Sequence, residues 1–285
     1  MPKFYRKARV LTVSGGKGGT GKSFVAVNLA AAMAMRLNST GPSKKKSFTG
    51  NRVLLFDADF HLSNDHLFLG VKLSPCLDRF LKNPESLPEY IVSTEYGVDL
   101  ISFGGDEHKI NFIENNVSMD ILKELNRLEM FYDWIIVDTG AGLSKMIIKQ
   151  IHFADHSLLV TNPDATAMID CYKMIKFITI EKPDFKNIDI CMNRVGTFEE
   201  GYLTFKKLQD ILLQFRVPVK IYYAGPVYYD RDMFARCLQR GIPAVLTNDN
   251  PNHIRESMNY IWDFINKKNI TRKMESFFER IFLGE

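Results

Sequence analysis

A phosphate-binding loop constrains this chain more than any other stretch of its sequence. Residues 16–23 are G-K-G-G-T-G-K-S and satisfy the spacing G-x-x-x-x-G-K-[ST]. Arg9–Ser14 predicts a buried strand before the loop, and Phe24–Leu37, rich in Ala, Met and Leu, predicts a helix after it. A loop in this position turns backbone N–H groups toward phosphate oxygens, and the helix dipole adds partial positive charge. The alternative is an ordinary glycine-rich turn.

The motif assigns separate tasks to its residues. Lys22 is expected to reach the β- and γ-phosphates, and the Ser23 hydroxyl is expected to ligate Mg²⁺. The residues expected to contact the nucleotide here are Gly16, Lys17, Gly18, Gly19, Thr20, Gly21, Lys22, Ser23 and Phe24.

A second lysine in the loop, Lys17, narrows the choice among families of phosphate-binding-loop proteins. The string S-G-G-K-G-G-T-G-K-S resembles the deviant Walker A loop of the MinD/ParA family of dimerising ATPases. The resemblance implies ATP and Mg²⁺ as cofactors and a homodimer with ATP. It also implies that Lys17 crosses the dimer interface and touches the nucleotide of the partner subunit. The alternative is a solvated lysine on a loop.

Carboxylates end two further predicted strands. Arg52–Phe56 leads to Asp57 and Asp59, and the apolar run Trp134–Val137 leads to Asp138. The carboxyl ends of parallel strands form the edge where ligands bind, so these side chains are expected beside a magnesium–phosphate group. Two aspartates that only cap a helix are the alternative for the first pair.

The family resemblance assigns roles to these carboxylates. The segment after the first of these strands is similar to the first switch of MinD-type ATPases, which implies that Asp59 positions the hydrolytic water. D-T-G-A-G, which starts at Asp138, is similar to the second switch. The implied metal residues are Ser23, Asp57 and Asp138, and the implied catalytic residues are Lys17, Lys22 and Asp59.

Two later strand ends are expected to hold the base. Ile188–Met192 predicts a strand, and Asn193 and Arg194 after it resemble the adenine-reading position of the family. An Asn side chain carries a donor and an acceptor, which suits the adenine edge. In relatives, the backbone and proline that correspond to Gly225 and Pro226 pack against the base. An Asn that merely caps a loop is the alternative.

Strands alternate with helices along the whole chain. This order predicts an α/β fold, a doubly wound and mostly parallel sheet of about seven or eight strands with helices on both faces. We expect one P-loop ATPase domain over residues 1–270 and a separate C-terminal helix over residues 271–285. Residues 38–51 include three adjacent lysines and resemble an insertion, either a mobile solvated loop or a basic patch for lipid or nucleic acid.

The C-terminal segment has one strongly apolar face. Its members, spaced as on a helix, are Met274, Phe277, Phe278, Ile281 and Phe282. Basic residues precede it, so the segment is expected to anchor the chain peripherally on the inner face of the cytoplasmic membrane when ATP is bound. The alternative is a helix docked on its own domain.

Composition narrows the location and the partners. The four cysteines are far apart, without a C-x-x-C pair, and no signal peptide is visible, so we expect a cytoplasmic protein without an iron–sulfur site held within one chain. The net charge of +4 is only a mild excess of positive charge, so nucleic acid is not expected as a partner.

Residues 160–176, V-T-N-P-D-A-T-A-M-I-D-C-Y-K-M-I-K, resemble the flagellar-number regulators (FlhG/FleN type) within the MinD/ParA family. The resemblance implies a slow ATPase switch that regulates flagellar number, placement and assembly. Its implied partners are a flagellar GTPase, flagellar switch-complex proteins or a flagellar transcription regulator. The chain begins M-P-K-F-Y-R-K-A-R without the D-Q-A-x-x-L-R element of some relatives, which puts GTPase activation in doubt.

Rival hypotheses remain at this stage. They are a MinD-type ATPase of division-site selection, a ParA-type DNA-partition ATPase, an iron–sulfur carrier of the same fold, and an adapter that binds ATP without hydrolysing it.

Overall fold

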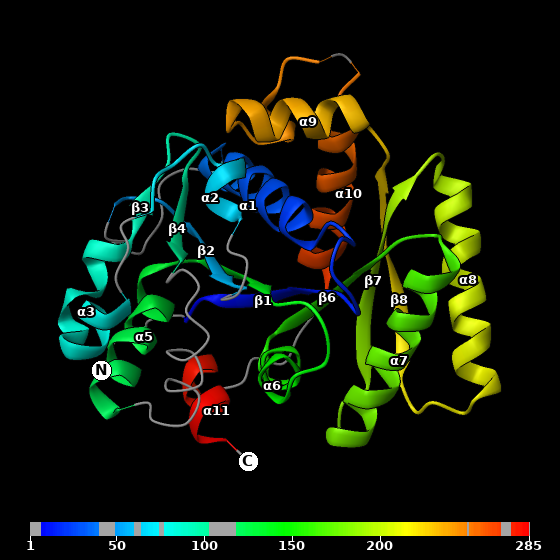
Figure 1. Ribbon diagram of the computed structural model, residues 1–285, viewed down its shortest axis with the longest axis horizontal. Helices are drawn as coiled ribbons and strands as arrows, with labels where there is room; N and C mark the ends of the chain where they lie inside the picture. Colours follow the sequence, from blue (N-terminus) through cyan, green and yellow to red (C-terminus); the bar gives the residue numbers. More distant parts are fainter. Residues whose placement is uncertain are drawn as a thin grey trace.

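The computed structural model of the chain has one central sheet with helices on both faces (Figure 1). It describes residues 7–39, 49–59, 64–73, 77–102, 118–249, 251–268 and 275–284. Within these residues the sheet has eight strands in the order β3-β4-β2-β5-β1-β6-β7-β8. All neighbouring strands are parallel except β3 and β4. The predicted doubly wound α/β fold is confirmed.

The strands are β1 (Arg9–Ser14), β2 (Val53–Ala58), β3 (Val92–Ser93), β4 (Val98–Ser102), β5 (Trp134–Thr139), β6 (His156–Thr161), β7 (Asn187–Val195) and β8 (Lys220–Tyr228). The α-helices are α1 (Lys22–Ser39), α2 (Asp65–Phe68), α3 (Leu77–Lys82), α5 (Met119–Phe131), α6 (Lys145–Phe153), α7 (Ala165–Glu181), α8 (Phe198–Gln214), α9 (Arg231–Arg240), α10 (His253–Lys267) and α11 (Phe277–Leu283). Two 3₁₀ segments are η1 (Pro84–Tyr90) and η2 (Ala244–Leu246).

Apolar side chains on both faces of the strands organise the two helical layers. β2, β5 and β6 are buried along their whole length, as expected of central parallel strands. One core lies between the sheet and α1, α9 and α10, where the Trp134 and Trp262 rings meet at 5.3 Å. Two further cores cover the opposite face, one under α5 and α11 and one under α7 and α8.

Two predicted strand ends are wrong. β7 runs on through Asn193 and Arg194, and β8 runs on through Gly225 and Pro226, so these residues lie inside strands rather than after them. The ladder continues because Gly225 takes a φ of +140° where the register shifts between Ile190 and Cys191. Pro226 is tolerated because β8 is the last strand of the described sheet, where a missing N–H donor costs little.

The apolar face predicted near the C-terminus is docked on the domain in this conformation, as in the alternative to a membrane anchor. Phe277, Phe278 and Ile281 are 2–3% exposed and pack against α5, α6 and β2 (Figure 1). Met274 lies outside the described residues, as do Cys76 and most of the basic loop. No helix among the described residues is long and apolar enough to cross a bilayer.

A buried carboxylate fixes the start of α11. Oε1 of Glu129, on α5, accepts hydrogen bonds from the Ser276 hydroxyl at 2.5 Å and the Phe277 amide at 2.7 Å. Asn126, one turn earlier on α5, donates from its Nδ2 to Glu279 Oε1 at 2.9 Å. The helix is therefore held by polar contacts at one end and by apolar burial along its face.

We expect Glu129→Ala to loosen α11 without unfolding the domain. The change leaves buried donors at the start of the helix without an acceptor, which costs about 1–3 kcal/mol. Hydrogen exchange of the amides in residues 277–283 should be faster in this variant than in the wild type. Asp120→Ala, an exposed position on the same helix α5, is the matched control. Equal exchange rates in all three proteins would contradict the assignment.

Candidate functional site

Strand register brings the predicted carboxylates together at one edge of the sheet. Asp57 on β2 is aligned with Asp138 on β5, and Asp138 is aligned with Val13 on β1. β1 ends at Ser14, one residue after Val13, so the phosphate loop that follows passes directly beside both carboxylates. The site is therefore built from three neighbouring strands, β2, β5 and β1, and from the N-terminus of α1.

Glycine allows the loop to take its path. Gly19 and Gly21 have φ values of +80° and +89°, in the region that only glycine enters readily. Gly16 approaches α7 so closely that a Cβ there would lie 2.5 Å from the Asp170 carbonyl oxygen. Two of these glycines therefore set the turn, and the third allows close packing on α7.

Ser23 and Asp138 meet at the base of the loop. The Ser23 hydroxyl donates to Asp138 Oδ2 at 2.5 Å, and Asp138 is completely buried. Burial and the Asp57 charge raise the pKa of Asp138 to about 7, while Lys22 and the Ser23 hydrogen bond act in the opposite direction. The second oxygen, Asp138 Oδ1, has no hydrogen-bond partner among the described residues. This oxygen-rich, negatively charged set fits Mg²⁺, a hard cation that prefers oxygen ligands.

Asp59 stands at the rim of this group. It is partly buried, its backbone N–H donates to Asp57 Oδ1 at 3.1 Å, and its carboxylate faces the position of Gly140 after β5. The two predicted switch segments therefore lie next to each other. The role of Asp59 in positioning water stays a prediction.

Lys17 contacts α7 in this single chain. Its Nζ donates to Thr166 Oγ1 at 2.8 Å and lies 3.5 Å from Asp164 Oδ1. Asp164 also caps α7 by accepting from the Ala167 amide. Sequence reasoning did not foresee this contact. The exposed pair is worth about 0–1 kcal/mol, so the lysine can change partners at little cost.

A pocket opens beside the loop, beyond the phosphate site. Its wall consists of Gly21, Phe24, Asn193, Arg194, Tyr228, Tyr229, Asp230, Arg231, Phe234 and Ile254. Asn193 donates from Nδ2 to the Thr20 carbonyl at 2.7 Å, which leaves its side-chain oxygen as the group able to accept from an adenine amino group. Arg194 has a φ of +59°, an uncommon value for a residue other than glycine.

Sequence reasoning placed only part of this wall. Pro226, predicted to pack against the base, is not among the lining residues. Tyr228, Tyr229 and Phe234 do line the pocket, and no sequence signal marked them for this position. Tyr228 is the last residue of β8 and Tyr229 follows it, while Phe234 reaches the pocket because α9 folds back over Phe24.

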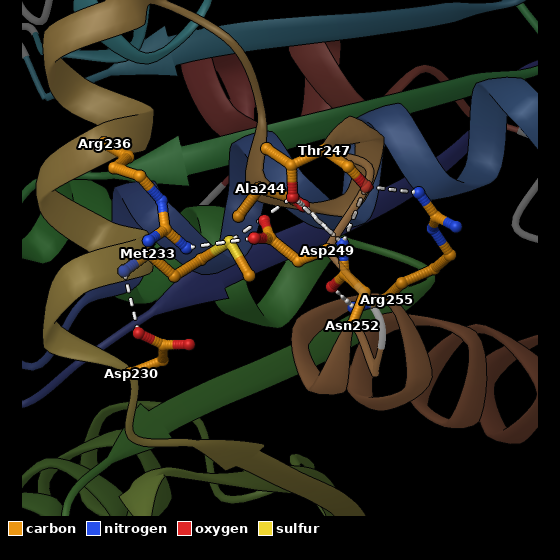
Figure 2. Close-up of polar contacts among 8 residues, drawn as sticks. All are labelled: Asp230, Met233, Arg236, Ala244, Thr247, Asp249, Asn252 and Arg255. Carbon is orange, nitrogen blue, oxygen red and sulfur yellow. Dashed lines mark hydrogen bonds and ion pairs between the residues drawn. The ribbon is translucent and has the colours of Figure 1, made fainter.

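A polar network holds the pocket wall in place (Figure 2). Asp230 caps α9 by accepting from the Met233 amide at 2.7 Å, and Asn252 donates to the Ala244 carbonyl at 2.8 Å. Arg255 adds a hydrogen bond of 2.8 Å to the Thr247 carbonyl. Asn28 of α1 accepts from the Val245 amide, which ties the helix after the phosphate loop to the same frame.

The loop glycines give a direct test of this geometry. In Gly21→Ala, the new Cβ would collide with the side-chain amide of Asn193, and alanine would have to adopt the positive φ of Gly21. We therefore expect the unfolding free energy to fall by about 1–3 kcal/mol. Gly18 has open space around it and is the matched control, with an expected change within about 0.5 kcal/mol for Gly18→Ala. Urea denaturation of the nucleotide-free proteins measures both. Equal stability of the two variants would refute the described loop.

Comparison with known proteins places the chain in a family. Residues 6–198 match a ParA family model described as NUBPL iron-transfer P-loop NTPase. The flagellum site-determining protein YlxH of Helicobacter pylori is 27% identical over 219 residues, 77% of this chain and 69% of that protein. The antiactivator FleN of Pseudomonas aeruginosa is 26% identical over 225 residues, 79% of this chain and 75% of FleN.

A solved structure shares the fold. The septum site-determining protein MinD of Pyrococcus horikoshii, in complex with Mg-ADP, superposes with a TM-score of 0.67 at 22% identity. The match covers 91% of this chain and 96% of the MinD chain.

Proposed function

Because the chain belongs to the ParA family of P-loop NTPases, we propose that it is an ATP-driven switch that pairs with a second copy of itself. ATP and Mg²⁺ bind at the loop, two chains close face to face, and hydrolysis separates them. The observation that carries the proposal is the second loop lysine. Among the described residues, Lys17 is held only by the exposed Asp164 and Thr166 at the start of α7, and it can exchange them for the phosphates of a partner's nucleotide.

The site residues supply the chemistry of this cycle. Ser23 and Asp138, already in contact, would hold Mg²⁺, and Asp57 would support it from the next strand. Bound there, Mg²⁺ would neutralise phosphate charge. Lys22 would reach the terminal phosphates, and Asp59 at the rim would orient the attacking water. The pocket beside Asn193 and Phe234 would take the nucleoside.

A role in regulating flagellar number or placement is supported by the name of one relative, the flagellum site-determining protein YlxH, and a regulatory role by that of another, the antiactivator FleN. The corresponding partners would be a flagellar GTPase, switch-complex proteins or a transcription regulator. Division-site selection is the second candidate, since the chain also resembles the Synechocystis septum site-determining protein MinD at 28% identity over 214 residues.

Iron transfer, which the family description names, has less support here. Cys171, Cys191 and Cys237 are all buried, and burial raises the pKa of both Cys171 and Cys191 to about 12. A metal is bound by the thiolate, which these surroundings disfavour. Among the described residues, the cysteines form no group of three metal ligands.

Sedimentation with ATP and with ADP tests the switch. We expect a dimer with ATP alone, a dimer that persists in Asp59→Ala with turnover lost, and dimerisation weakened in Lys17→Ala. Lys173→Ala, an exposed lysine paired on α7, is the control and should dimerise normally. A monomer under all conditions would contradict the switch, and unchanged turnover in Asp59→Ala would favour an adapter that does not hydrolyse ATP.

Membrane association would require α11 to leave its site, because its aromatic face is buried. Two weakly bound helices in a dimer would hold a bilayer far better than one. Flotation with anionic vesicles and ATP tests this part of the proposal. More binding by Glu129→Ala than by the wild type would support it, and no binding by either protein would exclude it.

A further inference from the structure

A third buried carboxylate lies at the site, and the functional assignment above gives it no task. Asp65, at the start of α2, is fully buried. One carboxylate oxygen from each of Asp57, Asp65 and Asp138 lies within 4.8 Å of the others. The sequence motifs singled out Asp57 and Asp138, but Asp65 follows the strand end by seven residues and carried no signal.

Asp65 differs from its neighbours in its hydrogen bonds. Asp138 accepts from Ser23, and Asp57 accepts from the Ser102 hydroxyl at 3.3 Å. Neither oxygen of Asp65 has a hydrogen-bond donor among the described residues. A buried carboxylate without donors loses its hydration and gains nothing in return, so it needs a proton or a cation.

The position of Asp65 is fixed by packing. The Phe68 ring of α2 contacts the Phe24 ring of α1 edge-on, with centroids 6.0 Å apart, and it also contacts Phe234 of α9. α2 is therefore seated on the helix that begins with Lys22 and Ser23. This packing holds the Asp65 carboxylate beside Asp138 instead of letting it turn to water.

The charges around the three carboxylates do not balance. Lys22 is the nearby cation that acts on Asp138, while Asp59 adds a further negative charge at the rim. Two oxygens bound to one divalent cation at 2.1–2.6 Å lie at most about 4.2–5.2 Å apart, and the three carboxylate oxygens, within 4.8 Å of one another, fall in this range. An ion with the short bonds of Mg²⁺ would draw the three side chains slightly closer together.

We propose that Asp57, Asp65 and Asp138 form a divalent-cation site that binds its ion before any nucleotide arrives. The ion lies at the carboxyl edge of β2 and β5, next to the Ser23 hydroxyl. Its chemical class is a hard, oxygen-seeking cation such as Mg²⁺ or Mn²⁺. Asp65 then acts as a direct ligand supplied by α2, in addition to the two strand-end carboxylates.

Mn²⁺ binding to the full-length, nucleotide-free protein tests the site. Electron paramagnetic resonance of unbound Mn²⁺ should show one ion bound per wild-type chain, displaced by Mg²⁺. Asp65→Asn keeps the size of the side chain and removes its charge, and we expect at least a roughly tenfold loss of Mn²⁺ affinity. Asp120→Asn, an exposed aspartate on α5, should bind like the wild type.

Thermal unfolding without metal accompanies the titration. Without metal, Asp65→Asn should melt at or above the wild-type temperature, because the substitution removes an uncompensated buried charge. Added Mn²⁺ should raise the melting temperature of the wild type but not that of Asp65→Asn. A wild type that binds no Mn²⁺ without nucleotide, as expected if Asp65 and Asp138 simply share a proton, would overturn the proposal. So would equal binding by Asp65→Asn. Neither result bears on ATP-dependent pairing, which sedimentation measures separately.

Discussion

The in-register pairing of β2 with β5 is the constraint from which the site follows. It sets Asp57 against Asp138 at the level where β1 releases the phosphate loop. The carboxylates are buried, so their negative charge is not screened by water, and Lys22 and the Ser23 hydroxyl partly offset it. A site with this excess of oxygen ligands is suited to a metal ion and to the triphosphate that the ion accompanies.

The same edge connects to elements that could change during a cycle. Lys17 reaches across the loop to Thr166 and Asp164 of α7, and the loop itself rests on α7 through Gly16. On the same face of the sheet as α7, α11 is bound to α5 by Glu129 and packs the Phe278 ring against Phe56 of β2. β2 thus carries Asp57 near its end and contacts α11 through the preceding residue, Phe56, so one strand touches both the site and the C-terminal helix.

Local patterns predicted much of the fold and the phosphate site. β1 matches its predicted bounds, because a short apolar run before a glycine loop leaves little freedom. Asp57 and Asp138 could be placed beside each other, since both end apolar strands of a parallel sheet. The sequence could not place Asp65, Tyr229 and Phe234 at the site. Tertiary packing of α2 and α9 brings these residues there, and no spacing in the sequence records that packing. The apolar periodicity of α11 was real, but periodicity alone cannot distinguish a face that meets lipid from one that meets its own domain.

The central claim is that this edge is a metal-dependent triphosphate site. Isothermal titration of ATP into the full-length protein, once with excess Mg²⁺ and once with EDTA, tests it most directly. The account predicts one ATP bound per chain, with affinity at least about tenfold higher when Mg²⁺ is present, and loss of that difference in Ser23→Ala. ATP binding of equal strength with and without metal, or no ATP binding at all, would contradict it.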